Sequence, residues 1–237
     1  MRPEKLKVKL LRFTADAERL CGTAASTSIK SGSPSDIFEK MDAETAKQKI
    51  RRVTAYGHGS IIEHASFTFS IEGVSRAMTH QLVRHRIASY TQQSQRYVEY
   101  NTLENYVTPP SIEQNQKAKE TYERALQEIS KTYQNLLKNG IPKEDARFIL
   151  PNAAKTNIIV TMNARELRHF FNLRCCERAQ WEIKETATEM LKLAKKATPA
   201  LFENAGPSCV EIGYCFEGKM KPKECDIPKI KRRFQNI

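Results

Sequence analysis

The sequence predicts a single α/β domain with long helices. Its 237 residues are enough for one sizeable core or two small ones. Some segments alternate apolar and polar residues as strands do, whereas others repeat apolar residues at helical spacing. We find no internal repeat and no interdomain linker. We therefore expect one domain over residues 1–237, with a loop-rich basic tail from about residue 205.

Three segments have the pattern of strands. Residues 6–13 alternate loosely between β-branched or apolar residues and basic ones. In residues 65–71, Phe67 and Phe69 alternate with polar neighbours. Residues 156–162 are rich in β-branched side chains, which is typical of a buried strand. The sequence therefore predicts at least these three strands.

Apolar spacing predicts five helices, over residues 43–56, 74–83, 111–137, 165–173 and 180–197. Gly57 is a plausible stop for the first of them. Gly140 ends the long third helix, and Pro142 begins another. Residues 31–35, Ser-Gly-Ser-Pro-Ser, are expected to form a loop.

The composition indicates a soluble cytoplasmic protein. No apolar run approaches the length of a membrane span. The first eight residues are too charged for a secretory signal. The six cysteines are expected as free thiols in a reducing compartment, and the spacing of Cys209, Cys215 and Cys225 is poor for a metal.

The net charge of +12 requires an explanation. Nucleic acid is the usual partner of so basic a chain. The lysines, however, are scattered over presumed helix surfaces and the tail, whereas the arginines gather around a few motifs. A protein that binds several small anions would show the same balance, so charge alone leaves both possibilities open.

The richest stretch covers residues 84–96, Arg-His-Arg-Ile-Ala-Ser-Tyr-Thr-Gln-Gln-Ser-Gln-Arg, which contain no acidic residue. Arginine presents a planar fork of donors that suits phosphate oxygens. In an extended segment Arg84 and Arg86 would project to one side, as would Ser94 and Arg96. Such a segment would hold two anionic groups, one at each end. The alternative is a solvated basic loop.

A bound nucleotide would have to be held by side chains. The nine glycines include no phosphate-binding glycine-rich loop, which argues against a standard nicotinamide domain. Ser94, Arg96 and Arg147 are the candidates for a nucleotide phosphate. Ser94 as a nucleophile would need an adjacent base, and the sequence does not place His85 beside it.

The spacing of Arg84, His85, Arg86, Ser89, Ser94 and Arg96 resembles the signature of the flavin-dependent thymidylate synthases. Further similar stretches follow in the family's order, at residues 144–151, 163–167, 172–174 and 179–183. The similarity runs from about residue 58 to 201. It implies a central, mostly antiparallel sheet with long helices, and a homotetramer with active sites at subunit interfaces.

The resemblance implies a methyltransferase that makes dTMP from dUMP. The methylene group of 5,10-methylenetetrahydrofolate would pass to C5 of the pyrimidine, with FADH2 as hydride donor and NADPH regenerating it. The unrelated folate-only enzymes use a cysteine in a Pro-Cys-His setting. None of the six cysteines here has that setting, which agrees with a flavin as the source of reducing power.

The resemblance also implies the site residues. Those for dUMP are Gln81, Arg84, Gln92, Gln93, Ser94, Gln95, Arg96, Arg147 and Arg174. Those for FAD are His58, Ser60, Arg84, His85, Arg86, Gln92, Asn163, Arg165 and His169. Thr91 and Gln92 depart from residues common in the family, which affects the expected flavin contact at Gln92.

Arg174 is the implied catalytic residue. Methylation at C5 needs electron density there, and a fixed guanidinium stabilises the anion that supplies it. The alternative is an ordinary arginine near a helix end. Arg165 and His169 are four apart and share a helix face. Arg174 is nine beyond Arg165, so either the helix ends first or the two arginines serve different walls of a site.

Three other functions are possible for a chain with these residues. For metal catalysis, no pair of histidines has HExxH-like spacing, so no metal is expected. The main alternative is a basic nucleic-acid-binding protein without catalysis, but aromatic and basic residues do not interleave as in RNA-binding sheets. A scaffold protein with intersubunit arginine salt bridges is a third possibility.

Overall fold

The computed structural model describes residues 6–100, 102–223 and 225–237. Residues 1–5 lie outside the described residues. They belong to the charged first eight residues that argue against a secretory signal. The chain divides into two compact units. The first contains Ile71–Arg84 and Tyr90–Ile159, and the second contains Val8–Ser70, His85–Ser89 and Val160–Ile237. We call them unit 1 and unit 2. A single domain over residues 1–237 stays a prediction.

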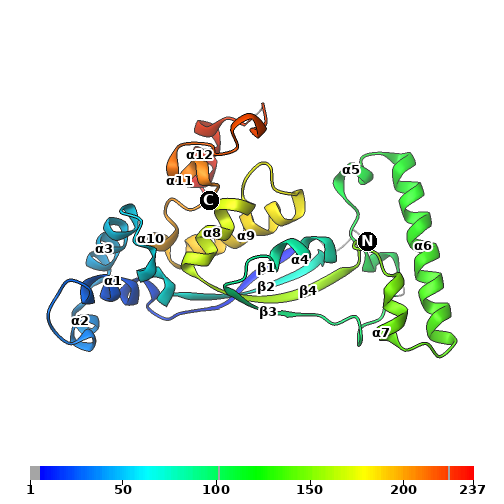
Figure 1. Cartoon of the computed structure of the whole chain (residues 1–237), viewed down its shortest axis with the longest axis horizontal. Helices are drawn as coiled ribbons and strands as arrows, with labels where there is room; N and C mark the ends of the chain where they lie inside the picture. Colours follow the sequence, from blue (N-terminus) through cyan, green and yellow to red (C-terminus); the bar gives the residue numbers. More distant parts are fainter. Residues whose placement is uncertain (1–5, 101, 224) are drawn as a thin grey trace. The chain divides into compact units, whose positions relative to one another are not determined.

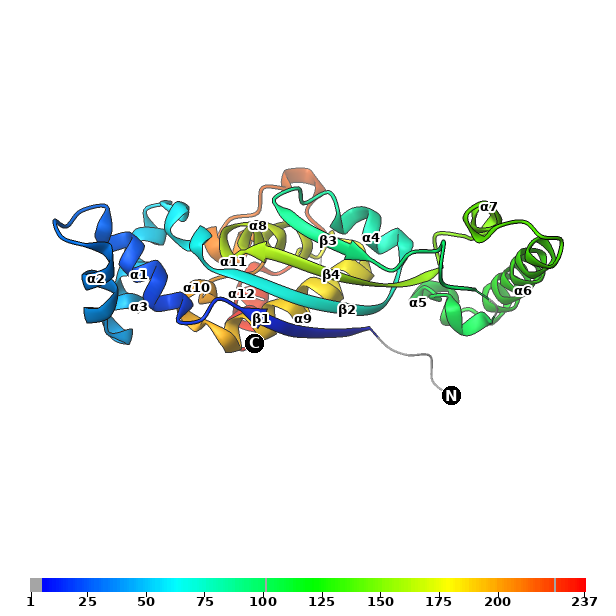
Figure 2. The ribbon, with the colours of Figure 1, turned by 90° about the horizontal axis from the view of Figure 1, so that it is seen from below.

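A four-stranded antiparallel sheet runs through the chain, as the resemblance implied. Its strands are β1 (Lys7–Phe13), β2 (Ser66–Ser75), β3 (Ala88–Gln92) and β4 (Lys155–Asn163). They pair in the order β1-β2-β4-β3, which Figure 2 shows. The three predicted strands are confirmed, and β3 lies inside the basic motif, where no strand was assigned.

The basic motif is not extended throughout, so the condition under which Arg84 and Arg86 would project to one side is not met. The backbone turns at Arg84 before β3, and it turns again from residue 95 to 97. Side chains therefore alternate between the two sides only along β3, which includes neither Arg84 nor Arg86. In the motif Arg84 and Arg86 are exposed, whereas His85 is buried.

One face of the sheet is buried and the other is more open. Phe67 and Phe69 of β2 are fully buried, as the alternating pattern predicts. In β4, Val160 and Met162 are buried whereas Ile159 is exposed, so this strand is buried on one face and not on both. In unit 2, α8 (Ala164–Arg174) and α9 (Trp181–Ala197) lie on one face of the strands (Figures 1 and 2).

Unit 2 also contains α1 (Ala17–Thr27), α2 (Pro34–Lys40), α3 (Ala43–Ala55) and the 3₁₀ helix η1 (Gly59–His64). Gly57 ends α3 with a φ of 80°, as predicted. The predicted loop at residues 31–35 is shorter, because Pro34 occupies the first turn of α2, where its missing N–H costs nothing.

The tail from residue 205 is more helical than predicted. It contains α11 (Ser208–Ile212), the 3₁₀ helix η4 (Gly218–Met220) and α12 (Ile227–Gln235), after the short α10 (Pro199–Phe202). The Asp226 side chain accepts the N–H of Lys229 and so caps α12. The basic run of residues 229–233 therefore lies on a helix.

Unit 1 contains α4 (Arg76–Leu82), α5 (Pro110–Glu113), α6 (Gln116–Lys138) and α7 (Lys143–Ala146), with 3₁₀ turns η2 (Leu103–Asn105) and η3 (Arg147–Ile149). The single helix predicted over residues 111–137 is wrong. Asn115 interrupts it, because its side chain accepts the N–H of Ala118 at 3.1 Å and starts α6. Ser75 likewise caps α4, so that helix begins later than predicted.

Unit 1 has its own aromatic cluster. Tyr100 and Tyr106 are buried together with Leu126 and Tyr133 of α6. No helix in the described part of the chain is long and apolar enough to cross a membrane. All six cysteines are free thiols.

Candidate active site

The residues expected around dUMP lie in unit 1, Arg174 excepted. Gln81 is in α4, and Arg84 is in the turn that follows. Gln92 ends β3, residues 93–96 form the next loop, and Arg147 begins η3. The sheet and the capped helix α4 thus position residues 81–96, whereas Arg147 is positioned by the end of α7.

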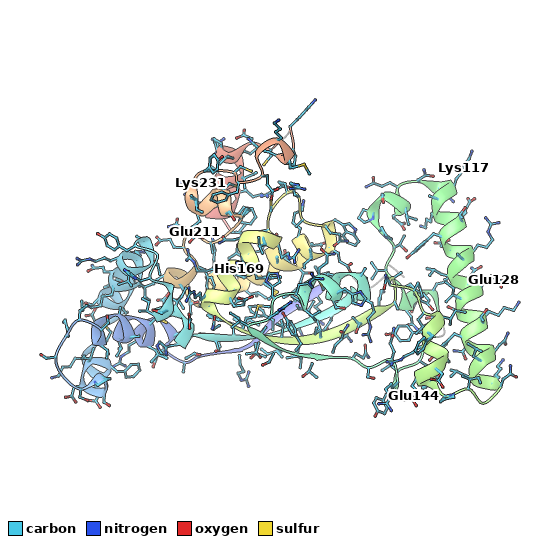
Figure 3. All side chains as sticks on the ribbon, in the orientation of Figure 1. Lys117, Glu128, Glu144, His169, Glu211 and Lys231 are labelled. Carbon is cyan, nitrogen blue, oxygen red and sulfur yellow. The ribbon has the colours of Figure 1, made fainter. Side chains whose placement is uncertain are left out.

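The far end of the basic motif and Arg147 contact the same residue, Glu144, through its carboxylate and its main-chain oxygen respectively. Arg96 Nη2 lies 2.8 Å from Glu144 Oε2. Arg147 Nε donates to the main-chain oxygen of Glu144 at 3.0 Å. Ser94 Oγ accepts the N–H of Arg96 at 3.2 Å. The candidates for the phosphate therefore gather around Glu144, which Figure 3 labels and to which the sequence had assigned no role.

Gln92 holds the motif in place within unit 1. Its Nε2 donates to Thr79 Oγ1 at 3.0 Å and to Thr156 Oγ1 at 3.3 Å, joining β3 to α4 and β4. The next residue, Gln93, donates its N–H to Asn157 O at 2.8 Å and accepts from Arg76 Nη2 at 2.8 Å. These bonds fix the backbone that leads to Ser94.

The residues expected around the flavin lie mostly in unit 2. His58 precedes η1, Ser60 is in η1, and both are exposed. Arg86 is exposed in the loop before β3. Asn163 Oδ1 accepts the N–H of Glu166 at 2.9 Å and starts α8, which carries Arg165 and His169.

Arg165 extends from the first turn of α8 to η1. Its Nη1 lies 2.5 Å from Glu63 Oε1, and both side chains are largely exposed. A Cβ added at Gly59 would lie 3.3 Å from Arg165 Nε, so glycine permits this close approach. His58, Ser60, Arg86 and His169 are exposed as well. Exposed polar and basic side chains of these types are suited in their chemistry to an anionic dinucleotide such as FAD. Among the residues described, no three metal-binding side chains are grouped.

His85 is buried, with 4% of its surface exposed. Its Nε2 accepts from Arg174 Nε at 3.1 Å, and its Nδ1 lies 3.3 Å from Glu166 Oε1. Its ring packs edge-on against Phe170 and His169, at 5.0 and 5.7 Å between centroids. Figure 3 labels His169 on α8.

The environment of His85 decides its charge. Burial, then the charges of Arg174 and His169, lowers the pKa of His85 to about 4. Burial raises the pKa of Glu166, against the opposing influence of His169. At neutral pH the imidazole is therefore uncharged. Its contact with Glu166 is a polar contact of a neutral ring and not an ion pair.

Comparison with known proteins decides the family. The thymidylate synthase complementing protein model matches residues 9–200. The flavin-dependent thymidylate synthase of Geobacter sulfurreducens is 48% identical over 98% of this chain and 99% of its own length. That of Pyrococcus abyssi is also 48% identical, over 93% of both. The chain belongs to the flavin-dependent thymidylate synthase family.

Solved structures agree with this assignment. Thymidylate synthase X from Helicobacter pylori with FAD and dUMP superposes with a TM-score of 0.68 at 25% identity, over 85% of this chain and 99% of that one. The UMP/dUMP methylase PolB of Streptomyces cacaoi, bound with 5-Br dUMP, gives 0.71 at 26% identity, over 84% and 94%. The chain is thus an enzyme, a flavin-dependent thymidylate synthase, as its sequence motifs predicted.

In this synthase α8 runs unbroken from Ala164 to Arg174, which decides between the two alternatives left open by the sequence. The helix does not end before Arg174. Arg165 contacts Glu63, whereas Arg174 contacts His85, so the two arginines have different neighbours.

Sequence reasoning assigned no role to Glu166. A signal was present, because Asn163 and Glu166 have the spacing of a capping box, in which the glutamate would return to the helix start. Here the carboxylate lies against His85 instead. That choice depends on a segment about 80 residues away, which no local pattern encodes.

Proposed function

We propose that this synthase transfers the methylene group of 5,10-methylenetetrahydrofolate to C5 of dUMP, with FADH2 as hydride donor and NADPH regenerating it. The observation that carries the site assignment is the placement of Arg174. It is half-buried at the end of α8 and held through Nε by a buried, neutral imidazole. A guanidinium fixed in this way stabilises charge that develops on a pyrimidine ring.

The phosphate of dUMP is assigned to Ser94, Arg96 and Arg147. Their shared neighbour Glu144 supports this, because it holds the two arginines in one place before a ligand arrives. A phosphate would replace the carboxylate as the partner of Arg96 with a stronger set of charge-assisted hydrogen bonds. The remaining residues proposed for dUMP are Gln81, Arg84, Gln92, Gln93, Gln95 and Arg174.

The flavin is assigned to His58, Ser60, Arg84, His85, Arg86, Gln92, Asn163, Arg165 and His169. When bound, it supplies the hydride that a thiol-independent methylation needs. Exposed side chains such as Ser60, Arg86 and Arg165 are suited to direct contact. The side chains of His85, Gln92 and Asn163 already have partners within the chain. We assign these three the task of shaping the surface around the cofactor.

We also propose that the enzyme is a homotetramer and that it is located in the cytoplasm. Phe148 and Tyr97, both in or beside the motif segments, are 85% and 75% exposed. Large exposed apolar side chains near a site are expected at an interface between subunits. The free thiols support a reducing compartment.

The purified protein tests the proposal directly. We expect a yellow protein with a flavin spectrum, faster NADPH oxidation when dUMP is present, and dTMP as product. Arg174→Ala should remain folded and flavin-bound but lose dTMP formation by about 100-fold or more. Arg178→Ala is the matched control, because Arg178 pairs with Glu217 and has no assigned role. Colourless protein that cannot be reconstituted with FAD would overturn the assignment.

A further inference from the structure

We propose that Glu166 and His85 are positioning residues that orient Arg174 through a carboxylate–imidazole–guanidinium chain. The proposal rests on the role assigned to Arg174 above. This carboxylate–imidazole–guanidinium chain consists of two contacts, Glu166 Oε1 to His85 Nδ1 at 3.3 Å and His85 Nε2 to Arg174 Nε at 3.1 Å. All three residues belong to unit 2.

Donor and acceptor chemistry fixes the state of the imidazole. Every nitrogen of an arginine side chain is a donor, so His85 Nε2 must accept and cannot carry a proton. The proton of the neutral ring then resides on Nδ1, where it faces the Glu166 carboxylate. A single tautomer satisfies both neighbours.

Burial makes this arrangement selective. His85 and Glu166 are 4% and 7% exposed, so little water competes with either contact. A second proton on His85 would set an Nε2–H against the Nε–H of Arg174. The neighbouring Arg174 and His169 also disfavour it, since their charges lower the pKa of His85. The imidazole is therefore a neutral and rigid spacer between the carboxylate and the guanidinium.

The geometry explains why orientation matters. Nε is part of the planar guanidinium, so an acceptor held at Nε restricts the plane and not just the position of the charge. Displacement of a catalytic group by about 1 Å can slow a reaction by about 100-fold. Glu166 sits eight residues before Arg174 on the same helix, and His85 joins the two from the segment before β3.

The contact between His85 and Arg174 gives neighbouring residues of the basic motif different tasks. Arg84 and Arg86 are exposed and suited to ligands, whereas His85 between them turns inward to α8. Within unit 2, the inward residue thereby connects the segment of residues 85–89 to the end of α8.

Kinetics of the flavin-bound enzyme test the proposal. Glu166→Ala should lower kcat by about 10- to 100-fold, with a much smaller change in KM for dUMP and unchanged flavin content. Glu166→Gln keeps an oxygen that accepts from Nδ1–H, so it should recover most of kcat. Glu211→Ala is the control. It removes the carboxylate partner of Arg168, another residue of α8, and neither Glu211 nor Arg168 belongs to the carboxylate–imidazole–guanidinium chain.

Two outcomes would separate the proposals. If Arg174→Ala retains full activity, the role of Arg174 is wrong. If Arg174→Ala is inactive but Glu166→Ala keeps wild-type kcat, the positioning role is wrong and the activator role stands.

Nitrogen NMR of the wild-type enzyme provides a test that does not depend on a variant folding. With ¹⁵N-labelled histidine, His85 should show a protonated Nδ1 and an unprotonated Nε2 at pH 7. An Nε2-protonated ring or an imidazolium at that pH would overturn the proposal.

Discussion

Arg174 Nε donates to His85 Nε2 at 3.1 Å, although 89 positions separate the two residues in the chain. The contact joins the basic motif to the C-terminal end of α8. It also makes the stability of the fold depend on the charge of one buried ring, because a protonated His85 cannot accept this hydrogen bond.

Acid should therefore destabilise the protein through His85. Its pKa is about 4 in the folded chain against 6.5 as the ordinary value. Between these values the unfolded chain binds a proton that the folded chain does not, so the free energy of unfolding falls as the pH falls. The full effect is about 3 kcal/mol by pH 4. Glu166, with its raised pKa, opposes part of it at the acid end.

Urea unfolding at pH 7 and pH 5 measures this dependence. His85→Gln keeps an acceptor and a donor but cannot titrate, so its free energy of unfolding should change less between the two pH values. Equal pH dependence in both proteins would contradict the assignment to His85.

Removing one hydroxyl from the aromatic cluster should stabilise unit 1. Tyr133 Oη is buried and has no hydrogen-bond partner among the residues that the structure describes. Tyr133→Phe should therefore raise the free energy of unfolding by about 1 kcal/mol, because a desolvated hydroxyl is removed. Tyr100→Phe is the matched control. Its Oη donates to Lys155 O at 2.6 Å, so its loss should destabilise by about 1 kcal/mol. Thermal unfolding compares the two.

Gly22→Ala should loosen the packing of α1 on α3. The added Cβ would lie 2.7 Å from Ala46 Cα, a backbone atom that cannot move aside alone. We expect a loss of about 1–3 kcal/mol in the free energy of unfolding. Thr27→Ala, at an exposed position of the same helix, should change it by less than about 0.5 kcal/mol. A neutral Gly22→Ala would mean that the two helices separate easily.

Asn115→Ala should weaken the start of α6. The Asn115 side chain satisfies the N–H of Ala118, and its loss should lower the free energy of unfolding by about 1 kcal/mol. Activity should not change, since no site residue lies on α6. Asn115→Asp keeps the acceptor and should retain the wild-type midpoint. Denaturant unfolding followed by circular dichroism measures the difference.

Several elements were predictable because their signals are local. Phe67 and Phe69 alternate with polar residues, and β2 forms there. Gly57 tolerates the positive φ that ends α3. The spacing from Arg84 to Arg96 was specific enough to indicate the family, its flavin and its reaction class. Each of these signals lies within a dozen or so neighbouring residues, and this is the range over which backbone preferences act.

The tertiary structure alone decided which residues meet. Glu144 was a neighbour of Arg147 in sequence, yet its contact with Arg96 depends on how the chain folds within unit 1. Glu166 has the spacing of a helix cap, but its carboxylate lies beside a buried histidine from another segment. Side-chain partners of this kind depend on burial and on contacts distant in sequence. The residue types of a site can therefore be predicted from the sequence, whereas the protonation state of His85 and the orientation of Arg174 are set by the fold.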